Sequence, residues 1–194
     1  MSGWEVFPMA FMESDPGWMD MFPTSGRDVT GRGSPSVDAQ TFRAVMGSFA
    51  SGVCVTTTVD AEGRPRGFTC SAVCSVSADP PLLLSGVSSR SGTLAAVLDR
   101  GRFAVNMLGR DGRRVSQIFA SPVADKFDRV RWSRGRVGGM PVLDGIVAYA
   151  ECELDQTVTA GDHTLLVGRL IGGGIGLDRH PLAYWRGGYA EVLR

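Results

Sequence analysis

Hydroxyl side chains gather in one stretch of this chain. Four lie at alternate positions of one predicted strand and five lie in and just after the next: Thr69, Ser71, Ser75 and Ser77, then Ser85, Ser88, Ser89, Ser91 and Thr93. Hydroxyl and neighbouring amide groups can line the edge of a heteroaromatic ring and hold a phosphate, which are the two polar parts of a flavin. A water-facing strand followed by polar turns explains the same hydroxyls equally well. The hydroxyls alone therefore leave the function open.

The other reactive side chains do not form a metal or redox motif. The chain has four cysteines without the two-residue spacing of zinc and redox sites, Cys54, Cys70, Cys74 and Cys152. We expect buried thiols in a reducing compartment and no metal site. Of the two histidines, His163 follows Asp162 in a predicted turn, where it either caps the turn or reaches a cleft. His180 is expected at the surface.

Common catalytic signatures are missing. The glycine-rich run from Gly172 to Gly176 lacks the dinucleotide-binding spacing, and no lysine follows it to complete a phosphate loop. We interpret this run as a flexible turn. The chain also has no Gly-x-Ser-x-Gly elbow and no paired-histidine zinc helix. Hydrolase and metalloenzyme functions therefore lose most of their support.

Composition and charge are those of an ordinary globular chain. Its 194 residues include 20 basic and 20 acidic side chains, and no apolar run has the length of a membrane span. We therefore expect no nucleic-acid partner, no membrane and a cytoplasmic location. Residues 1–35 mix large apolar side chains with proline and glycine without periodicity. They predict a flexible N-terminal extension joined to one domain over 36–194.

The periodicity beyond residue 35 predicts a mainly β fold with short α insertions. A helix is expected to begin at Ser36, to end at Gly52 and to bury four apolar side chains, Phe42, Val45, Met46 and Phe49. Strands are expected over 53–59, 67–76, 82–87, 103–108, 146–154 and 164–171, with a turn at 60–65 making the first two a hairpin. Short helices are expected over 91–100, capped by Ser91, and over 111–120. This pattern favours a barrel with a cleft at its mouth or between subunits.

A series of short motifs resembles one known family, the flavin reductase domain, which is the small component of two-component flavin-dependent monooxygenases. The motifs occur in the family's order at Phe42 to Val53, Gly67 to Ala72, Ser75 to Leu82, Ser88 to Thr93, Phe103 to Leu108, Phe119 to Ser121, Lys126-Phe127, Gly139 to Leu143, Gly161 to Thr164 and Pro181 to Tyr189. Each motif is weak alone, but their order over about residues 38–192 is specific.

The resemblance implies an FMN-binding split β-barrel, Greek-key-like, in which two subunits of a homodimer form the flavin clefts. It assigns the isoalloxazine edge to Thr69, Cys70, Ser71 and Ala72, and the ribityl chain and phosphate to Ser88, Ser89, Ser91 and Thr93, with Ser85 and Asn106 as further candidates. At a helix start, amide donors and the helix dipole favour the phosphate. Cysteine is unexpected at position 70, so only a main-chain contact is expected there.

The resemblance also implies that His163 is the catalytic residue, placed where the nicotinamide of NADH or NADPH approaches FMN or FAD. The expected activity is hydride transfer to the flavin, and the expected partner is a separate monooxygenase that receives free reduced flavin. The choice of flavin, of nicotinamide donor and of oxygenase stays open. The main alternative is a non-catalytic flavin-binding module on the same barrel. A pyridoxamine-phosphate-oxidase-like or deazaflavin-using barrel would need a phosphate site richer in arginine and lysine.

Overall fold

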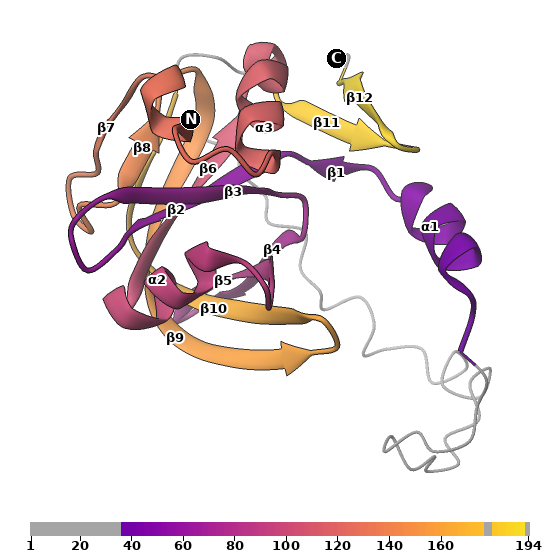
Figure 1. Ribbon diagram of the computed structural model, residues 1–194, viewed down its shortest axis with the longest axis horizontal. Helices are drawn as coiled ribbons and strands as arrows, with labels where there is room; N and C mark the ends of the chain where they lie inside the picture. The colour runs from indigo at the N-terminus through magenta and orange to yellow at the C-terminus, as the bar shows by residue number, and fades with distance from the viewer. Residues whose placement is uncertain (1–35, 177–179, 193–194) are drawn as a thin grey trace, which may run out of the picture. The chain divides into compact units, whose positions relative to one another are not determined.

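The computed structural model describes residues 36–176 and 180–192 (Figure 1). The predicted extension over 1–35 lies outside the described residues. All of the described residues except Ser36, Val37 and Asp38 belong to one unit of the chain, which begins at Ala39.

The first long strands form the predicted hairpin. Strand β2 (Cys54–Val59) pairs antiparallel with β3 (Pro65–Cys70). Every residue of β2 is buried although three are threonines. Their hydroxyls are bonded inside the fold; the Thr57 Oγ1, for example, donates to the Pro141 carbonyl oxygen at 2.6 Å. A β-branched run whose polar groups are satisfied in this way suits a central strand.

Seven strands build the main sheet. Strands β6 (Arg102–Leu108), β9 (Ile146–Ala160), β10 (His163–Ile175), β5 (Pro81–Ser88) and β4 (Val73–Ala78) join the hairpin in the order β3-β2-β6-β9-β10-β5-β4. All neighbours in this sheet are antiparallel. The prediction of a mainly β fold is confirmed. The edge strands β3 and β4 are not paired with each other in the described residues, so the pairing does not itself show a closed barrel.

Two helices complete the apolar clusters of the core. Helix α2 (Gly92–Arg100) buries Leu94 and Val97 in the same cluster as Phe103 of β6. Helix α3 (Arg113–Ala120) buries Phe119 in a second cluster and follows a short 3-10 helix, η3 (Arg110–Gly112). Both helices occur where the sequence periodicity predicts them.

The remaining elements are short. They are β1 (Ser51–Gly52), β11 (Leu182–Trp185) and β12 (Gly188–Glu191) in a three-stranded sheet, the pair β7 (Trp132–Arg134) and β8 (Pro141–Leu143), and the 3-10 helix η4 (Lys126–Arg129). Within 36–176 and 180–192, no helix has the length and apolar character needed to cross a membrane.

The first helix differs from its prediction in extent and burial. Helix α1 (Ala39–Gly47) begins after Ser36 and ends before Gly52, and none of its residues is buried. The four apolar side chains expected to face a core are more than half exposed: Phe42, Val45, Met46 and Phe49. The three-and-four spacing predicted the helix correctly, but no other element of the described chain covers its apolar face.

The strand predicted over 67–76 is two strands. Strand β3 ends at Cys70 and pairs with β2, whereas β4 begins at Val73 and pairs with β5. Ser71 and Ala72 form an exposed link between them. The hydroxyl alternation therefore runs across a break in the chain, and Thr69 lies on a different strand from Ser75.

The interpretation of the glycine-rich run as a turn is wrong. Gly172, Gly173 and Gly174 belong to β10 and pair with β9. A Cβ atom at Gly172 would lie 2.8 Å from Val137 Cγ2, and one at Gly174 would lie 2.8 Å from Tyr149 Cε1. Glycine in this strand therefore lets neighbouring side chains lie directly over the backbone.

Candidate functional site

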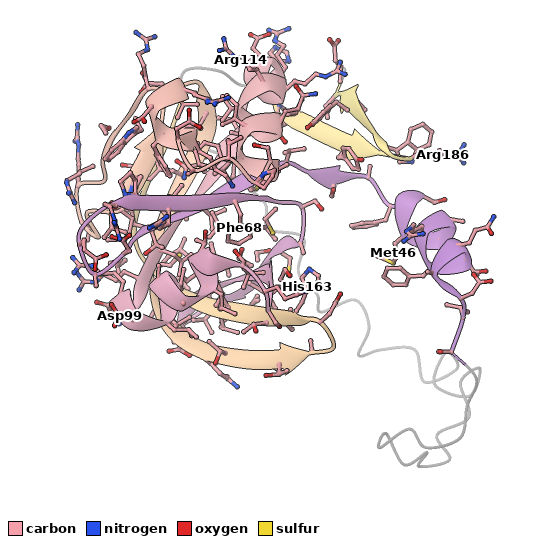
Figure 2. All side chains as sticks on the ribbon, viewed as in Figure 1. Met46, Phe68, Asp99, Arg114, His163 and Arg186 are labelled. Carbon is pink, nitrogen blue, oxygen red and sulfur yellow. The ribbon has the colours of Figure 1, made fainter. Side chains whose placement is uncertain are left out.

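A cavity of about 310 Å³ opens beside the link between β3 and β4. Separate segments of the chain line it: Phe68 to Ala72, Gly86 and Ser88 of β5, Ser91, Phe119 and Ala120 of α3, and His163. Figure 2 shows two of these residues, Phe68 on β3 and His163 at the start of β10. The cavity thus brings together the four residues predicted for the ring edge, two of those predicted for the phosphate end, and the predicted catalytic residue.

The β3–β4 link lies close beside β5. The Gly86 amide donates to the Ala72 carbonyl oxygen at 2.8 Å, and a Cβ atom at Gly86 would lie 3.0 Å from Ala72 Cβ. Glycine at position 86 therefore permits this approach. Ser71 and Ala72 are exposed, so the link presents its backbone along the edge of the cavity.

Cys70 turns its side chain away from solvent and into the fold. The thiol is buried and its Sγ donates to the Gly86 carbonyl oxygen at 3.1 Å. Burial raises the pKa of the Cys70 thiol, and the hydrogen bonds around it lower that pKa less. Because the thiol is occupied inside the fold, main-chain atoms are what this residue offers at the cavity.

Helix α3 is fastened to β3 next to the cavity. The Thr69 Oγ1 donates to the Ser116 carbonyl oxygen at 2.6 Å, and the Tyr189 hydroxyl donates to Ser116 Oγ at 3.0 Å. A Cβ atom at Gly67 would lie 2.9 Å from Phe119 Cε1. Glycine at position 67 thus lets the Phe119 ring pack against β3, where it forms part of the cavity wall.

The start of α2 supplies the features expected of an anion site. The Ser91 Oγ caps the helix by accepting from the Thr93 amide at 3.3 Å, and no acidic residue lies in the first turn. The Ser91 amide donates to the Ser88 carbonyl oxygen at 2.9 Å, which shapes the turn before the helix. Ser88 and Ser91 line the cavity, whereas Thr93 is buried in the wall of an adjoining groove. The positive end of a helix dipole therefore faces the cavity mouth.

Ser89 joins this turn to the turn that carries His163. Its amide donates to the Asp162 carbonyl oxygen at 3.0 Å, and its Oγ lies 3.4 Å from Thr164 Oγ1. Ser89 does not line the cavity. Its contacts instead fix the distance between the start of α2 and His163.

His163 is oriented by its neighbour in the turn. The His163 Nδ1 lies 2.7 Å from Asp162 Oδ1, and this hydrogen bond lowers the pKa of the Asp162 carboxyl. Gly161 adopts a φ of 62°, which permits the tight turn between β9 and β10. His163 is paired with Ser88 across the sheet. With Nδ1 committed to the carboxylate, Nε2 is the nitrogen left for a ligand.

Two predicted site residues lie elsewhere. Ser85 is fully buried with its Oγ 3.0 Å from Thr56 Oγ1. Asn106 is also fully buried; its Nδ2 donates to the Val55 carbonyl oxygen at 3.1 Å and its Oδ1 accepts from the Leu143 amide at 2.8 Å. Neither lines the cavity. Their polar groups hold strands of the core together.

Lys126 lies beside the cavity and was not among the residues predicted for the site. Its Nζ donates to the Phe119 carbonyl oxygen at 2.9 Å and lies 3.4 Å from the Gly67 carbonyl oxygen. Burial lowers the pKa of the Lys126 ammonium. It lines a second groove, of about 670 Å³, which shares Phe68 and Ser91 with the smaller cavity. The sequence did offer one signal for this residue, because Lys126 is the sole lysine of the chain.

The arrangement combines a polar backbone edge, an aromatic wall and a helix start around one small cavity. A heteroaromatic ring fits the edge, and a phosphate fits the helix start. In the described part of the chain, no group of three or more histidine, cysteine or acidic side chains is placed to hold a metal. The geometry therefore suits a bound flavin ring and its phosphate, with His163 at the open side.

Comparison with known proteins gives the family. Residues 46–193 match the sequence model described as "Flavin reductase like domain". The chain is 47% identical over 157 residues to a "Flavin reductase (NADH)" from Kitasatospora aureofaciens, covering 80% of this chain and 82% of that protein. It is 38% identical to the reductase component of a flavin-dependent trigonelline monooxygenase from Acinetobacter baylyi, covering 76% of this chain and 47% of that longer protein.

A solved structure supports the same relationship. The NADH:FAD oxidoreductase SgcE6 of Streptomyces globisporus, in complex with NAD and FAD fragments, superposes with a TM-score of 0.76 at 30% identity, covering 82% of this chain and 98% of that one. Residues 46–193, which match the family model, include the seven-stranded sheet, α2, α3 and the residues that line the cavity. This chain belongs to the flavin reductase like domain family.

Proposed function

We propose that this protein is an NAD(P)H-dependent flavin reductase, which transfers hydride from NADH or NADPH to FMN or FAD and supplies the reduced flavin to a separate monooxygenase. One observation carries the proposal: the cavity joins the backbone link at Ser71-Ala72, the start of α2 and His163 around a single space. Two relatives, one named as an NADH-dependent flavin reductase and one as a monooxygenase reductase component, support it.

The flavin ring is held mainly by backbone. Main-chain groups from Thr69 to Ala72 face the ring edge, and Phe68 and Phe119 form the apolar wall. Ser88, Ser91 and the start of α2 receive the ribityl chain and phosphate. A flavin enters this site as a substrate or a loosely held cofactor.

His163 acts on the nicotinamide. Hydride transfer between two flat rings needs the donor carbon within about 3 to 3.5 Å of the flavin acceptor atom, and little acid or base help. Asp162 fixes the imidazole by its 2.7 Å hydrogen bond, so Nε2 is presented to the carboxamide of the donor. The role of His163 is to position the nicotinamide over the flavin.

A homodimer on a split barrel completes the proposed assembly. A cavity of about 450 Å³, lined almost entirely by apolar side chains such as Val73, Leu82 and Leu170, opens on the same subunit. The apolar face of α1 is likewise left exposed within one chain. A second subunit would cover both surfaces. The cytoplasmic location stays a prediction.

The direct test mixes the purified protein with FMN or FAD and follows the nicotinamide absorbance after addition of NADH or NADPH. We expect oxidation of at least one donor only when flavin is present. Flavin binding without oxidation of either donor would instead indicate a non-catalytic flavin-binding protein. A further measurement adds the candidate oxygenase in a separate compartment, because free reduced flavin crosses a dialysis membrane and the protein does not.

A further inference from the structure

The larger groove lies directly beyond the proposed flavin ring. It holds about 670 Å³, roughly twice the volume of the ring cavity, and the two share Phe68 and Ser91 in their linings. A flavin that places its ring in the smaller cavity therefore directs its ribityl chain toward this groove. The groove is much larger than the terminal phosphate of FMN requires, and it lies within the size range of nucleotide-binding clefts.

Positive groups meet at the junction of the two spaces. The start of α2 and Lys126 both line the groove there. Two of the three Lys126 N–H groups are directed at the carbonyl oxygens of Phe119 and Gly67, which leaves one for a ligand. Gly92 has no side chain to block the helix start and nothing lies within 4 Å of its missing Cβ. A pyrophosphate at this junction would gain from both the helix dipole and the ammonium.

One face of α2 forms the floor of the groove. Gly92, Ala95, Ala96 and Asp99 follow the spacing of a single helix face, and all four line the groove. The first three are small and leave room for a flat group. Asp99, labelled in Figure 2, is the last residue of this face. At 1.5 Å per residue it lies about 10 Å along the helix from Gly92. Its carboxylate is an acceptor for ribose hydroxyls or an exocyclic amine.

The opposite wall presents a guanidinium that is fixed in place. The Arg66 Nε and Nη2 donate to Asp60 Oδ2 at 3.0 and 2.8 Å, and the Arg64 Nε donates to the same oxygen at 2.9 Å. Asp60 is nearly covered, with 12% of its side chain exposed. A planar guanidinium held by one carboxylate can stack on a purine ring, and Pro65 beside it adds an apolar surface.

The charges of the groove balance. Arg64, Arg66 and Lys126 are opposed by Asp60, Glu62 and Asp99 in the same lining. A site for a bare polyphosphate would carry an excess of positive charge. The groove has cationic groups at one end and paired charges and small apolar side chains beyond them. This arrangement suits a nucleoside joined to a phosphate.

We propose that this groove binds an adenosine 5′-phosphate group, and that the group is the adenylate half of FAD, which makes FAD the preferred flavin of this chain. The inference rests on the flavin reductase function proposed above, because the ring cavity must hold the isoalloxazine. The adenylate of NADH or NADPH has the same chemistry and is the competing source.

The test compares flavin affinities without any nicotinamide present. Dissociation constants for FAD and FMN are measured by flavin fluorescence titration for the wild type, for Ala95→Phe in the groove, and for the matched control Leu98→Phe, an exposed position of α2 outside the groove. We expect the wild type to bind FAD at least tenfold more tightly than FMN. Ala95→Phe is expected to reduce this preference at least fivefold, and Leu98→Phe to preserve it.

A second measurement needs no substitution. Added AMP is expected to raise the apparent dissociation constant of FAD at least fivefold and that of FMN by less than twofold, because the FMN complex leaves the groove open. A third arm measures the KM for NADH and NADPH with FMN as the acceptor, where the wild type and Ala95→Phe are expected to agree.

The outcomes separate the possibilities. Equal wild-type affinity for FAD and FMN, or an unchanged preference in a folded Ala95→Phe protein, overturns the proposal. A raised KM for the nicotinamide donor with an unchanged flavin preference assigns the groove to the donor's adenylate and also overturns it. If the wild type prefers FAD but oxidises neither donor, the proposed reductase function fails while the adenylate site stands.

Discussion

Substitution of Gly86 by alanine tests whether the backbone link at Ala72 holds the flavin. A Cβ atom at position 86 would lie 3.0 Å from Ala72 Cβ, whereas carbon atoms in contact prefer about 3.5–4.0 Å. The link must therefore move by about 0.5–1 Å. The 2.8 Å hydrogen bond from the Gly86 amide to the Ala72 carbonyl oxygen is strained by the same movement.

The expected loss follows from the contacts that move. Main-chain hydrogen bonds contribute about 0.5–1.5 kcal/mol each, so loss of one or two weakens flavin binding by about 1–2 kcal/mol. That range corresponds to about a 5- to 30-fold rise in the dissociation constant. Fluorescence titration with FMN and FAD measures it, and circular dichroism checks that the strand survives.

A second substitution makes the reasoning refutable. Ala72→Gly removes the atom that clashes, so the double variant Gly86→Ala/Ala72→Gly should recover most of the lost affinity. Gly188→Ala is the control, because a Cβ atom at position 188 would make only an ordinary contact, at 3.8 Å from the Trp185 carbonyl oxygen. An unchanged affinity in Gly86→Ala, or a double variant as weak as the single one, would refute the role assigned to the link.

Three further predictions concern individual side chains. His163→Ala should slow hydride transfer at least tenfold in stopped-flow measurements and change the flavin dissociation constant less than twofold, since the imidazole is assigned to the nicotinamide. Asp60→Asn should lower the Tm at neutral pH; burial would raise the pKa of the Asp60 carboxyl, but hydrogen bonds from Arg64 and Arg66 outweigh it and lower that pKa to about 2. Because a lowered pKa stabilises the fold only while the group is ionised, the Tm difference should be full above pH of about 4 and vanish toward pH 2. Glu151→Gln should reduce the free energy of unfolding by about 1–3 kcal/mol in urea titrations, because the fully buried Glu151 accepts from the Val137 amide at Oε2 and from the Gly138 amide at Oε1, at 3.0 and 2.8 Å, and in glutamine one of these oxygens is replaced by an NH2 group that faces a donor.

The sequence predicted those elements that carry their own local signals. The hairpin follows from a β-branched run and the turn residues Asp60 to Gly63, and the Gly63 φ of 77° is the conformation that glycine permits. Helix α2 follows from its serine cap and the αL glycine at its end, Gly101. Such features act within a few residues, so a single sequence displays them.

Errors arose where a distant segment decides the structure. The glycine run of β10 is a strand because Tyr149 and Val137 pack over it, and neither is near it in sequence. The break at Ser71 gave no signal because hydroxyl side chains continue on both sides of it, with Thr69 before the break and Ser75 after it. Helix α1 was predicted from its spacing, but the spacing does not say which chain covers the apolar face.

At the proposed site the order of motifs is more informative than any single residue. Cys70 stands where another residue type was expected, yet its thiol donates inward to the Gly86 carbonyl oxygen, and the residue still lines the cavity. A site made of backbone tolerates such changes, because the position of the chain matters and the side chain does not. What the proposed site requires is the spacing that brings the link close to β5, above all the glycine at position 86. By contrast Ser85 and Asn106, which the resemblance offered as further candidates, have their polar side chains bonded within the core. Side-chain chemistry near a motif is therefore weaker guidance in this fold than the glycines that let strands approach one another.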